Sequence, residues 1–169
     1  MATYYFDGSD AGASDPNTAW SNDANAFDGS IETTANTTTK GTTSANYLMA
    51  EGTNAPSSGH DIIGVKARIY GAVAGGVNPF LEATIYTNGL VQSLISVSTV
   101  SSTLGWSAYS AFLTVPTGGW LWSVIQALEI KIYANNDSGS LTTVNPYRAE
   151  VLVVTSPYPQ SLYRIQNFS

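Results

Sequence analysis

The segment from Thr114 to Ala134 constrains the fold of this chain more than any other part of its sequence. It ends in Leu128-Glu-Ile-Lys-Ile-Tyr133, in which aliphatic and polar side chains alternate. Successive side chains of a β-strand point to opposite faces of the sheet. The alternation is therefore typical of an antiparallel strand with one buried and one polar face. A turn with Pro116 and two glycines precedes this strand, and the whole segment indicates a β-sandwich.

Similar segments recur along the chain at fairly regular spacing, and in Asp61–Ala72 the apolar residues Ile63, Val65, Ala67 and Ile69 alternate with Gly64, Lys66, Arg68 and Tyr70. Asn88-Gly89 lies between two apolar runs, which is the sequence pattern of a tight β-hairpin. Thr3–Phe6 is a further short run of β-forming residues, and Gly119–Ala127 has room for a single helical turn. The strands that we expect are Asn46–Glu51, Asp61–Ala72, Phe80–Thr87, Leu90–Val100, Trp106–Val115, Ala127–Ala134 and Tyr147–Thr155.

Seven or eight strands without a long helix predict an all-β fold. We expect a two-sheet antiparallel β-sandwich, jelly-roll-like, with extended terminal arms. A length of 169 residues is enough for one core. The expected sandwich domain covers residues 1–155, including a long polar loop at 9–45, and residues 156–169 form a C-terminal arm.

The long polar loop contains Trp20, Phe27 and Ile31 as isolated apolar residues, and its part Thr33–Ser44 is rich in threonine. A long loop held by single aromatic residues is often a contact surface. Disorder is the alternative interpretation. The C-terminal segment begins with two prolines and then offers an apolar stripe too short to fold alone, so it packs on its own domain or on a neighbour.

Charge and composition exclude several classes of function. The net charge is −6 and the six basic residues are scattered, which argues against nucleic-acid binding. The chain has no cysteine, so disulfides and thiolate zinc sites are excluded. The apolar runs have the length of strands rather than of membrane helices, and no secretory signal is visible, so we expect synthesis in the cytoplasm. Charged residues make up only 11% of the chain, which suits a surface that an assembly covers.

Most charged residues on the expected strands occupy the polar phase, where opposite charges on neighbouring strands can pair across the sheet. These residues are Lys66, Arg68, Glu82, Glu129, Lys131, Arg148 and Glu150.

The sequence offers little sign of catalysis. His60 is the single histidine, and although Ser57, Ser58 and Asp61 are close in sequence, an exposed turn histidine is the favoured interpretation. Asp23–Gly29 is rich in oxygen-bearing side chains but lacks the spacing of a calcium loop, so Asx turns are expected there. We predict no enzyme, no cofactor and no metal.

Two blocks of the chain resemble β-sandwich proteins of tailed bacteriophages. The first is Trp20-Ser-Asn-Asp-Ala-Asn-Ala-Phe-Asp28-Gly29, followed by the threonine-rich loop and Ile62–Ile69. The second is Pro116-Thr-Gly-Gly-Trp120-Leu-Trp122-Ser-Val-Ile-Gln-Ala-Leu128-Glu-Ile130. The first block is also similar to discoidin-like carbohydrate-binding modules, although their other hallmarks are missing here.

The phage resemblance implies a virion structural protein, such as a capsid decoration (cement) protein on the outer surface of the head. Its partners would be the major capsid protein and copies of itself in a homotrimer, with no nucleic acid and no membrane. The alternative is a tail or fibre module that binds surface glycans through exposed aromatic residues such as Trp120 or Tyr109. A hydrolase that uses His60 is a weaker third option.

The contact regions that we expect are the N-terminal segment, the Thr33–Ser44 loop and the 156–169 arm. Of the two tryptophans in the second block, we expect one in the core and one at an interface. The candidate interface residues are Tyr4, Tyr5, Phe6, Trp120, Trp122, Tyr158, Leu162, Tyr163, Ile165 and Phe168.

Overall fold

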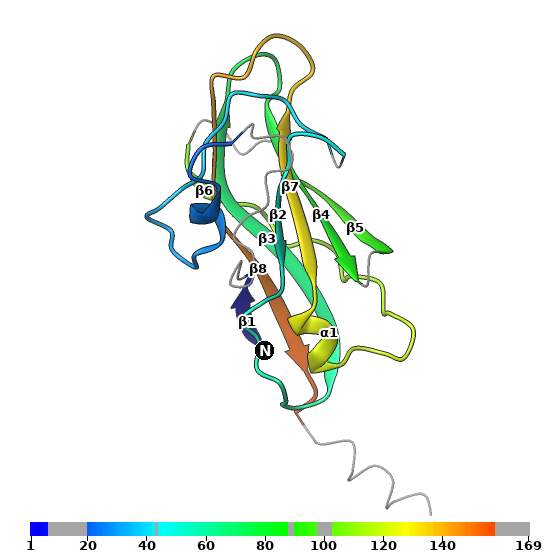
Figure 1. Ribbon diagram of the computed structural model, residues 1–169. Helices are drawn as coiled ribbons and strands as arrows, with labels where there is room; N and C mark the ends of the chain where they lie inside the picture. Colours follow the sequence, from blue (N-terminus) through cyan, green and yellow to red (C-terminus); the bar gives the residue numbers. More distant parts are fainter. Residues whose placement is uncertain (7–19, 43, 88–89, 98–102, 158–169) are drawn as a thin grey trace, which may run out of the picture.

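The computed structural model describes residues 1–6, 20–42, 44–87, 90–97 and 103–157, which form two packed antiparallel sheets (Figure 1). The first sheet has the order β1-β8-β3-β6, with bounds Ala2–Tyr5, Thr143–Thr155, Ile62–Ala74 and Gly105–Trp106. The second sheet has the order β2-β7-β4-β5, with bounds Leu48–Glu51, Glu129–Asn135, Phe80–Thr87 and Leu90–Val97.

The strand pairs are nested along the chain. β1 pairs with β8, β2 with β7, β3 with β6 and β4 with β5, as in one long hairpin that has been rolled up. The pairing of β3 with β8 completes the first sheet, and the pairing of β4 with β7 completes the second. This connectivity is that of an eight-stranded jelly roll, and the prediction of an all-β sandwich is confirmed.

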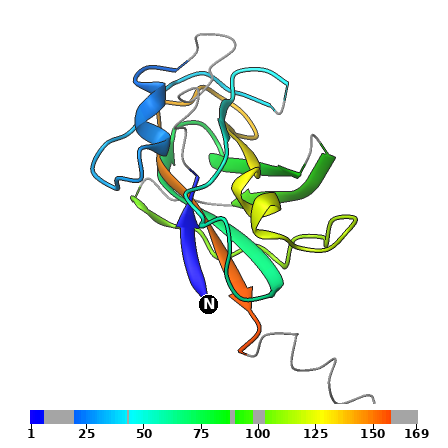
Figure 2. The same cartoon turned by 60° about the horizontal axis from the view of Figure 1, so that its bottom comes forward.

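The core lies between the sheets and is built by the alternating residues of the long strands. Val65, Ala67 and Ile69 of β3 have no exposed surface, and neither do Ile130 and Ile132 of β7. The two helices are short and lie at the margins of the sandwich (Figure 2): the 3₁₀-helix η1 (Asp23–Phe27) and α1 (Trp122–Gln126). No helix in the described ranges has the length and apolar character needed to cross a membrane.

Two expectations about the strands are wrong. The alternation in β3 predicts Ile63 in the core, but a register shift between Ile62 and Gly64 leaves its side chain 60% exposed. The expected strand Trp106–Val115 is a strand only at β6, and residues 107–113 follow β3 in a different conformation. By contrast, β4 has the predicted bounds, and the helical turn predicted in Gly119–Ala127 is α1.

The described part of the polar loop is held by the core rather than detached from it. Trp20 and Phe27 are buried as predicted, whereas Ile31 is exposed. The Trp20 indole N–H donates to the backbone oxygen of Asn46, at 3.2 Å. Residues 7–19, Ser98–Val100 of the fourth expected strand, and residues 158–169 of the expected arm lie outside the described residues.

Candidate interaction face

The segment that follows β6 covers the edge of β3 through an unusual set of hydrogen bonds. The backbone N–H groups of Ser107 and Ser110 donate to the carbonyl oxygens of Ile69 and Ala67, at 2.9 and 2.8 Å. In return, the N–H groups of Ile69 and Ala67 donate to the Oγ atoms of Ser107 and Ser110, both at 3.0 Å. Serine hydroxyls thus replace the carbonyl acceptors of a neighbouring strand, and this stretch of the sheet edge is satisfied.

The 106–113 segment and β3 have different residue spacings along this contact. The segment moves three residues for every two residues of β3, and the next N–H, that of Leu113, donates to Val65 at 2.8 Å. Because of this three-residue step, Trp106, Tyr109 and Phe112 occupy equivalent positions in the segment. Their rings lie over the outward side chains of β3.

These rings cover the cations of β3. The guanidinium carbon of Arg68 lies 4.0 Å from the ring centroid of Trp106 and 4.4 Å from that of Tyr109. The ammonium of Lys66 lies 4.6 Å from the centroid of Phe112. Cation–π contacts of this kind contribute about 0.5–2 kcal/mol each, more where water is excluded.

A buried carboxylate lies beneath the rings. Glu150 of β8 is only 3% exposed, and its Oε1 accepts a hydrogen bond of 2.6 Å from Nε of Arg68 and one of 3.2 Å from the Tyr109 hydroxyl. The Nε atom of Arg148 is 3.7 Å from Oε2. A charge buried to this extent is stable only where it is paired and hydrogen-bonded, so these contacts hold the outward side chains in place.

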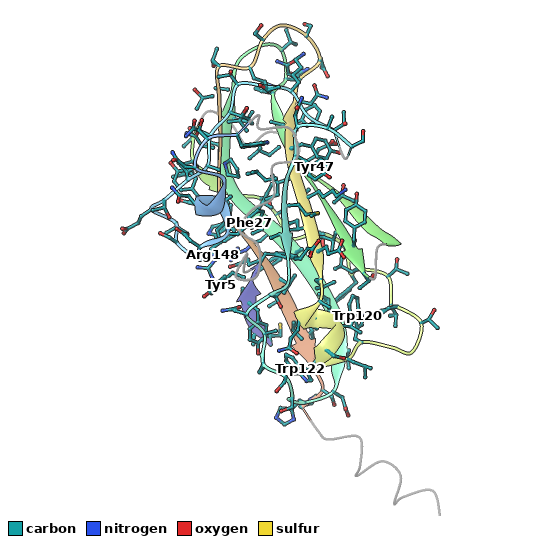
Figure 3. All side chains as sticks on the ribbon, viewed as in Figure 1. Tyr5, Phe27, Tyr47, Trp120, Trp122 and Arg148 are labelled. Atoms are coloured by element: carbon teal, nitrogen blue, oxygen red, sulfur yellow. The ribbon has the colours of Figure 1, made fainter. Side chains whose placement is uncertain are left out.

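Further rings extend this arrangement across the sheet. The Tyr70 ring centroid lies 5.0 Å from that of Trp106 and 5.9 Å from that of Tyr147. On β1, the Tyr5 ring lies 4.9 Å from the guanidinium carbon of Arg148, and Figure 3 shows the two side chains next to each other. We call this outer surface of the first sheet the aromatic face, and it consists of Tyr5, Lys66, Arg68, Tyr70, Trp106, Tyr109, Phe112, Tyr147, Arg148 and Glu150.

Part of the aromatic face is open to solvent. Trp106 is 37% exposed and Phe112 58% exposed. Ile63 at the start of β3 and Val115 expose about three fifths of their surface. Exposed rings and aliphatic groups next to partly exposed arginines are the composition of a protein–protein contact surface.

The outer surface of the second sheet has a different character. Tyr133 of β7 lies opposite Glu82 of β4. Burial, the hydrogen bond to Glu82 and the negative charge of Glu82 raise the pKa of Tyr133 well above its usual value. The Lys131 ammonium lies 4.3 Å from the Tyr47 ring centroid and 5.2 Å from that of Tyr86. We call this surface the acidic face, and it consists of Tyr47, Met49, Glu51, Glu82, Tyr86, Glu129, Lys131 and Tyr133.

The candidate interface residues of the sequence divide into three groups. Phe6 and Trp120 belong to the core and offer little or no surface to a partner, because Phe6 is fully buried and Trp120 is 7% exposed. Tyr4, Tyr5 and Trp122 are half-buried. The remaining five, which are Tyr158, Leu162, Tyr163, Ile165 and Phe168, lie outside the described residues.

Of the two tryptophans of the second block, Trp120 lies in the core, as expected for one of them, and Trp122 is half-buried. Trp122 contacts Tyr4 edge to face, with ring centroids 5.8 Å apart, and its indole N–H donates to the backbone oxygen of His60 at 3.0 Å. Figure 3 shows Trp120 and Trp122 near α1, away from the Tyr5 and Arg148 pair. The structure therefore places Tyr5 on the aromatic face but Trp122 elsewhere.

The residues considered for catalysis or metal binding have ordinary surroundings. His60 is exposed in its turn, as predicted. Asp28 forms the expected Asx turn, because its Oδ1 accepts from the N–H of Ser30 at 2.8 Å, and its Oδ2 accepts from the Thr33 hydroxyl. Among the described residues, no three histidine, aspartate or glutamate side chains are grouped so that they could hold a metal ion.

Sequence reasoning missed most of the aromatic face. The repeat Trp106-Ser-Ala-Tyr109-Ser-Ala-Phe112 is visible in the sequence, and its period of three differs from the period of a strand. A period of three could have indicated a segment whose serine hydroxyls accept the hydrogen bonds of the neighbouring strand.

Neither the protein-family models nor the curated proteins nor the solved structures include a match to this chain. Its candidate site therefore rests on the geometry of the aromatic face.

Proposed function

We propose that this chain is a virion structural protein, a capsid decoration protein that binds by non-covalent contacts through its aromatic face. The observation that carries the proposal is the exposure of Trp106 and Phe112 above a row of cations that Glu150 and the aromatic rings hold in place. Tryptophan, tyrosine and arginine dominate the energy of protein interfaces. Because their side chains are already ordered, little conformational entropy is lost on binding.

Two further features support a place in a particle. The jelly roll occurs in viral capsid proteins and in lectins, although a fold does not determine a function. The blocks at Trp20–Gly29 and Pro116–Ile130 resemble tailed-phage structural proteins. A decoration protein needs no catalytic site, since many weak contacts repeated over a shell give strong attachment.

The experiment adds the purified chain to phage heads that lack their decoration protein. We expect saturable binding and heads that resist heating better than undecorated heads. Phe112→Ser removes an exposed ring from the aromatic face and should weaken head binding about tenfold or more. Leu121→Ser is the matched control, because Leu121 is 56% exposed but lies at the start of α1. Absence of saturable binding, or equal effects of both variants, would contradict the proposal.

A glycan-binding module is the second candidate, and one observation favours it. A pocket of about 380 Å³ opens between the 36–39 loop and the start of β8. Its lining side chains are all hydroxyls and amides, which suit a neutral polyhydroxylated ligand. They belong to Ser21, Asn36, Thr37, Thr38, Thr39, Thr142, Thr143 and Asn145. Glycan-array binding that Thr143→Val abolishes, together with no binding to heads, would favour this candidate.

A further inference from the structure

The outer surfaces of the two sheets carry opposite charge. The aromatic face has three cations, Lys66, Arg68 and Arg148, and one carboxylate, that of Glu150. The acidic face has the reverse set, three carboxylates and the single ammonium of Lys131. A chain with a net charge of −6 thus keeps half of its six basic residues on one sheet face.

The acidic face contains a repulsive arrangement. Glu51 and Glu129 are directly opposite each other in the pairing of β2 with β7. Like charges in such cross-strand positions are destabilising. In the described part of the chain, no ion pair joins Glu51 or Glu129 to a cation. A cation supplied from outside would relieve this repulsion.

We infer that the aromatic face of one copy binds the acidic face of a second copy. Besides the complementary charge, the acidic face presents Tyr47 and Met49, half-buried residues of the types enriched at interfaces. On the partner surface, the Lys66 ammonium lies beside the exposed ring of Phe112, so a carboxylate that approaches it also meets apolar surface.

The two faces lie on opposite layers of the sandwich, so the contact joins different surfaces of the two copies. Such a heterologous contact leaves one free face of each kind on a dimer and closes only in a ring. Since the two faces point away from each other, repetition of this contact stacks copies in a row rather than in a small closed ring. The inference goes beyond the proposed function: in such a row one end copy keeps its aromatic face free for the capsid protein, and every other aromatic face binds a neighbouring copy.

The first test measures the oligomeric state of the full chain by sedimentation at low and high salt. We expect an oligomer at 50 mM NaCl that dissociates in 500 mM NaCl, because ions screen contacts between charged surfaces. Lys66→Glu on the aromatic face and Glu51→Lys on the acidic face should each weaken association about tenfold or more. Asp137→Lys, in the exposed turn between β7 and β8 and a member of neither face, changes the net charge as Glu51→Lys does and should associate like the wild type.

The second test mixes the two interface variants. The Lys66→Glu chain keeps an intact acidic face and the Glu51→Lys chain an intact aromatic face, so one unaltered contact can form between them. We expect dimers that contain one of each variant and grow no further. A monomeric wild type at both salt concentrations, variants that associate like the wild type, or a mixture without mixed dimers would each overturn the inference.

Head binding is measured on the same samples and separates the two proposals. A wild-type chain that binds heads but does not self-associate contradicts the inference alone. A chain that self-associates as expected but never binds heads contradicts the proposed function alone.

Discussion

Arg68 and Glu150 are directly opposite each other in the pairing of β3 with β8, and the Nε and Nη2 atoms of Arg68 both contact Oε1 of Glu150, at 2.6 and 2.5 Å. The carboxylate is 3% exposed, whereas the arginine side chain is 26% exposed. Glu150 is therefore shielded by its partner, and the rings of Trp106 and Tyr109 lie against that partner in turn. This pair links the fold of the first sheet to the surface that we propose for binding.

Loss of the Glu150 charge should destabilise the protein. In Glu150→Gln, Arg68 and Arg148 lose their carboxylate, and we expect the free energy of unfolding to fall by about 1–3 kcal/mol. Urea denaturation measures this change. Glu32→Gln removes a carboxylate from an exposed loop position and should have almost no effect. A Glu150→Gln variant as stable as the wild type would show that the pair contributes nothing net.

The serine hydroxyls at the β3 edge should contribute as much to stability as the backbone carbonyl acceptors of a paired strand would. Ser107→Ala and Ser110→Ala each leave a backbone N–H of β3 without its acceptor, which costs about 1–3 kcal/mol. Hydrogen exchange gives a specific readout. The Ile69 amide should exchange faster in the first variant and the Ala67 amide in the second. Ser123→Ala, at an exposed position of α1, is the control, and unchanged protection in both edge variants would contradict the assignment.

Much of the sandwich could be predicted from alternation alone. In Leu128–Ile132 burial alternates as the sequence indicates, because a strand with one buried face must alternate. β4 keeps its apolar phase buried as predicted, but Thr84 and Tyr86 of its polar phase are buried as well. Alternation fails at Ile63, because an irregular register inverts the side that a residue faces. Sequence also gives no sign of which aromatic residues point inward, and this is why Phe6 was expected at an interface although it is a core residue.

The aromatic face was harder to predict, for a related reason. Its members come from β1, β3, the 106–113 segment and β8, and only the register between these elements brings them together. The residues 107–113 resemble a strand in composition, but their N–H groups bond to β3 at every third residue. The cross-strand pairing of opposite charges was expected, and the pair Arg68–Glu150 confirms it.

The Tyr133 phenol should make stability depend on pH in the alkaline range. Its pKa is raised in the folded state, by burial first and by Glu82 second, whereas in the unfolded chain it is about 10. The stabilisation by the protonated phenol is therefore complete below about pH 10 and is lost as the pH rises beyond it, because the unfolded state releases its proton first. Urea denaturation at several pH values from about 8 to about 11, which span the pKa of the unfolded chain, should show this decline.

Tyr133→Phe should reduce that alkaline decline, since the variant has no phenol to ionise there. Tyr147→Phe, on the aromatic face of the other sheet, is the matched control and should keep it. Equal slopes of stability against pH in the wild type and in Tyr133→Phe would show that this phenol does not control the alkaline behaviour.

The polar loop should depend on Phe27 for its attachment to the sandwich. Phe27 is 2% exposed at the end of η1, which packs on β8, whereas Ile31 is 49% exposed four residues later. Phe27→Ala should therefore lower the free energy of unfolding by about 3–5 kcal/mol. Ile31→Ala should change it by no more than about 0.5 kcal/mol. Limited proteolysis adds a local readout, because a loop released from the core is cleaved within residues 20–42 before the sandwich is. Equal stability and equal cleavage of the two variants would mean that contacts other than Phe27 hold this loop.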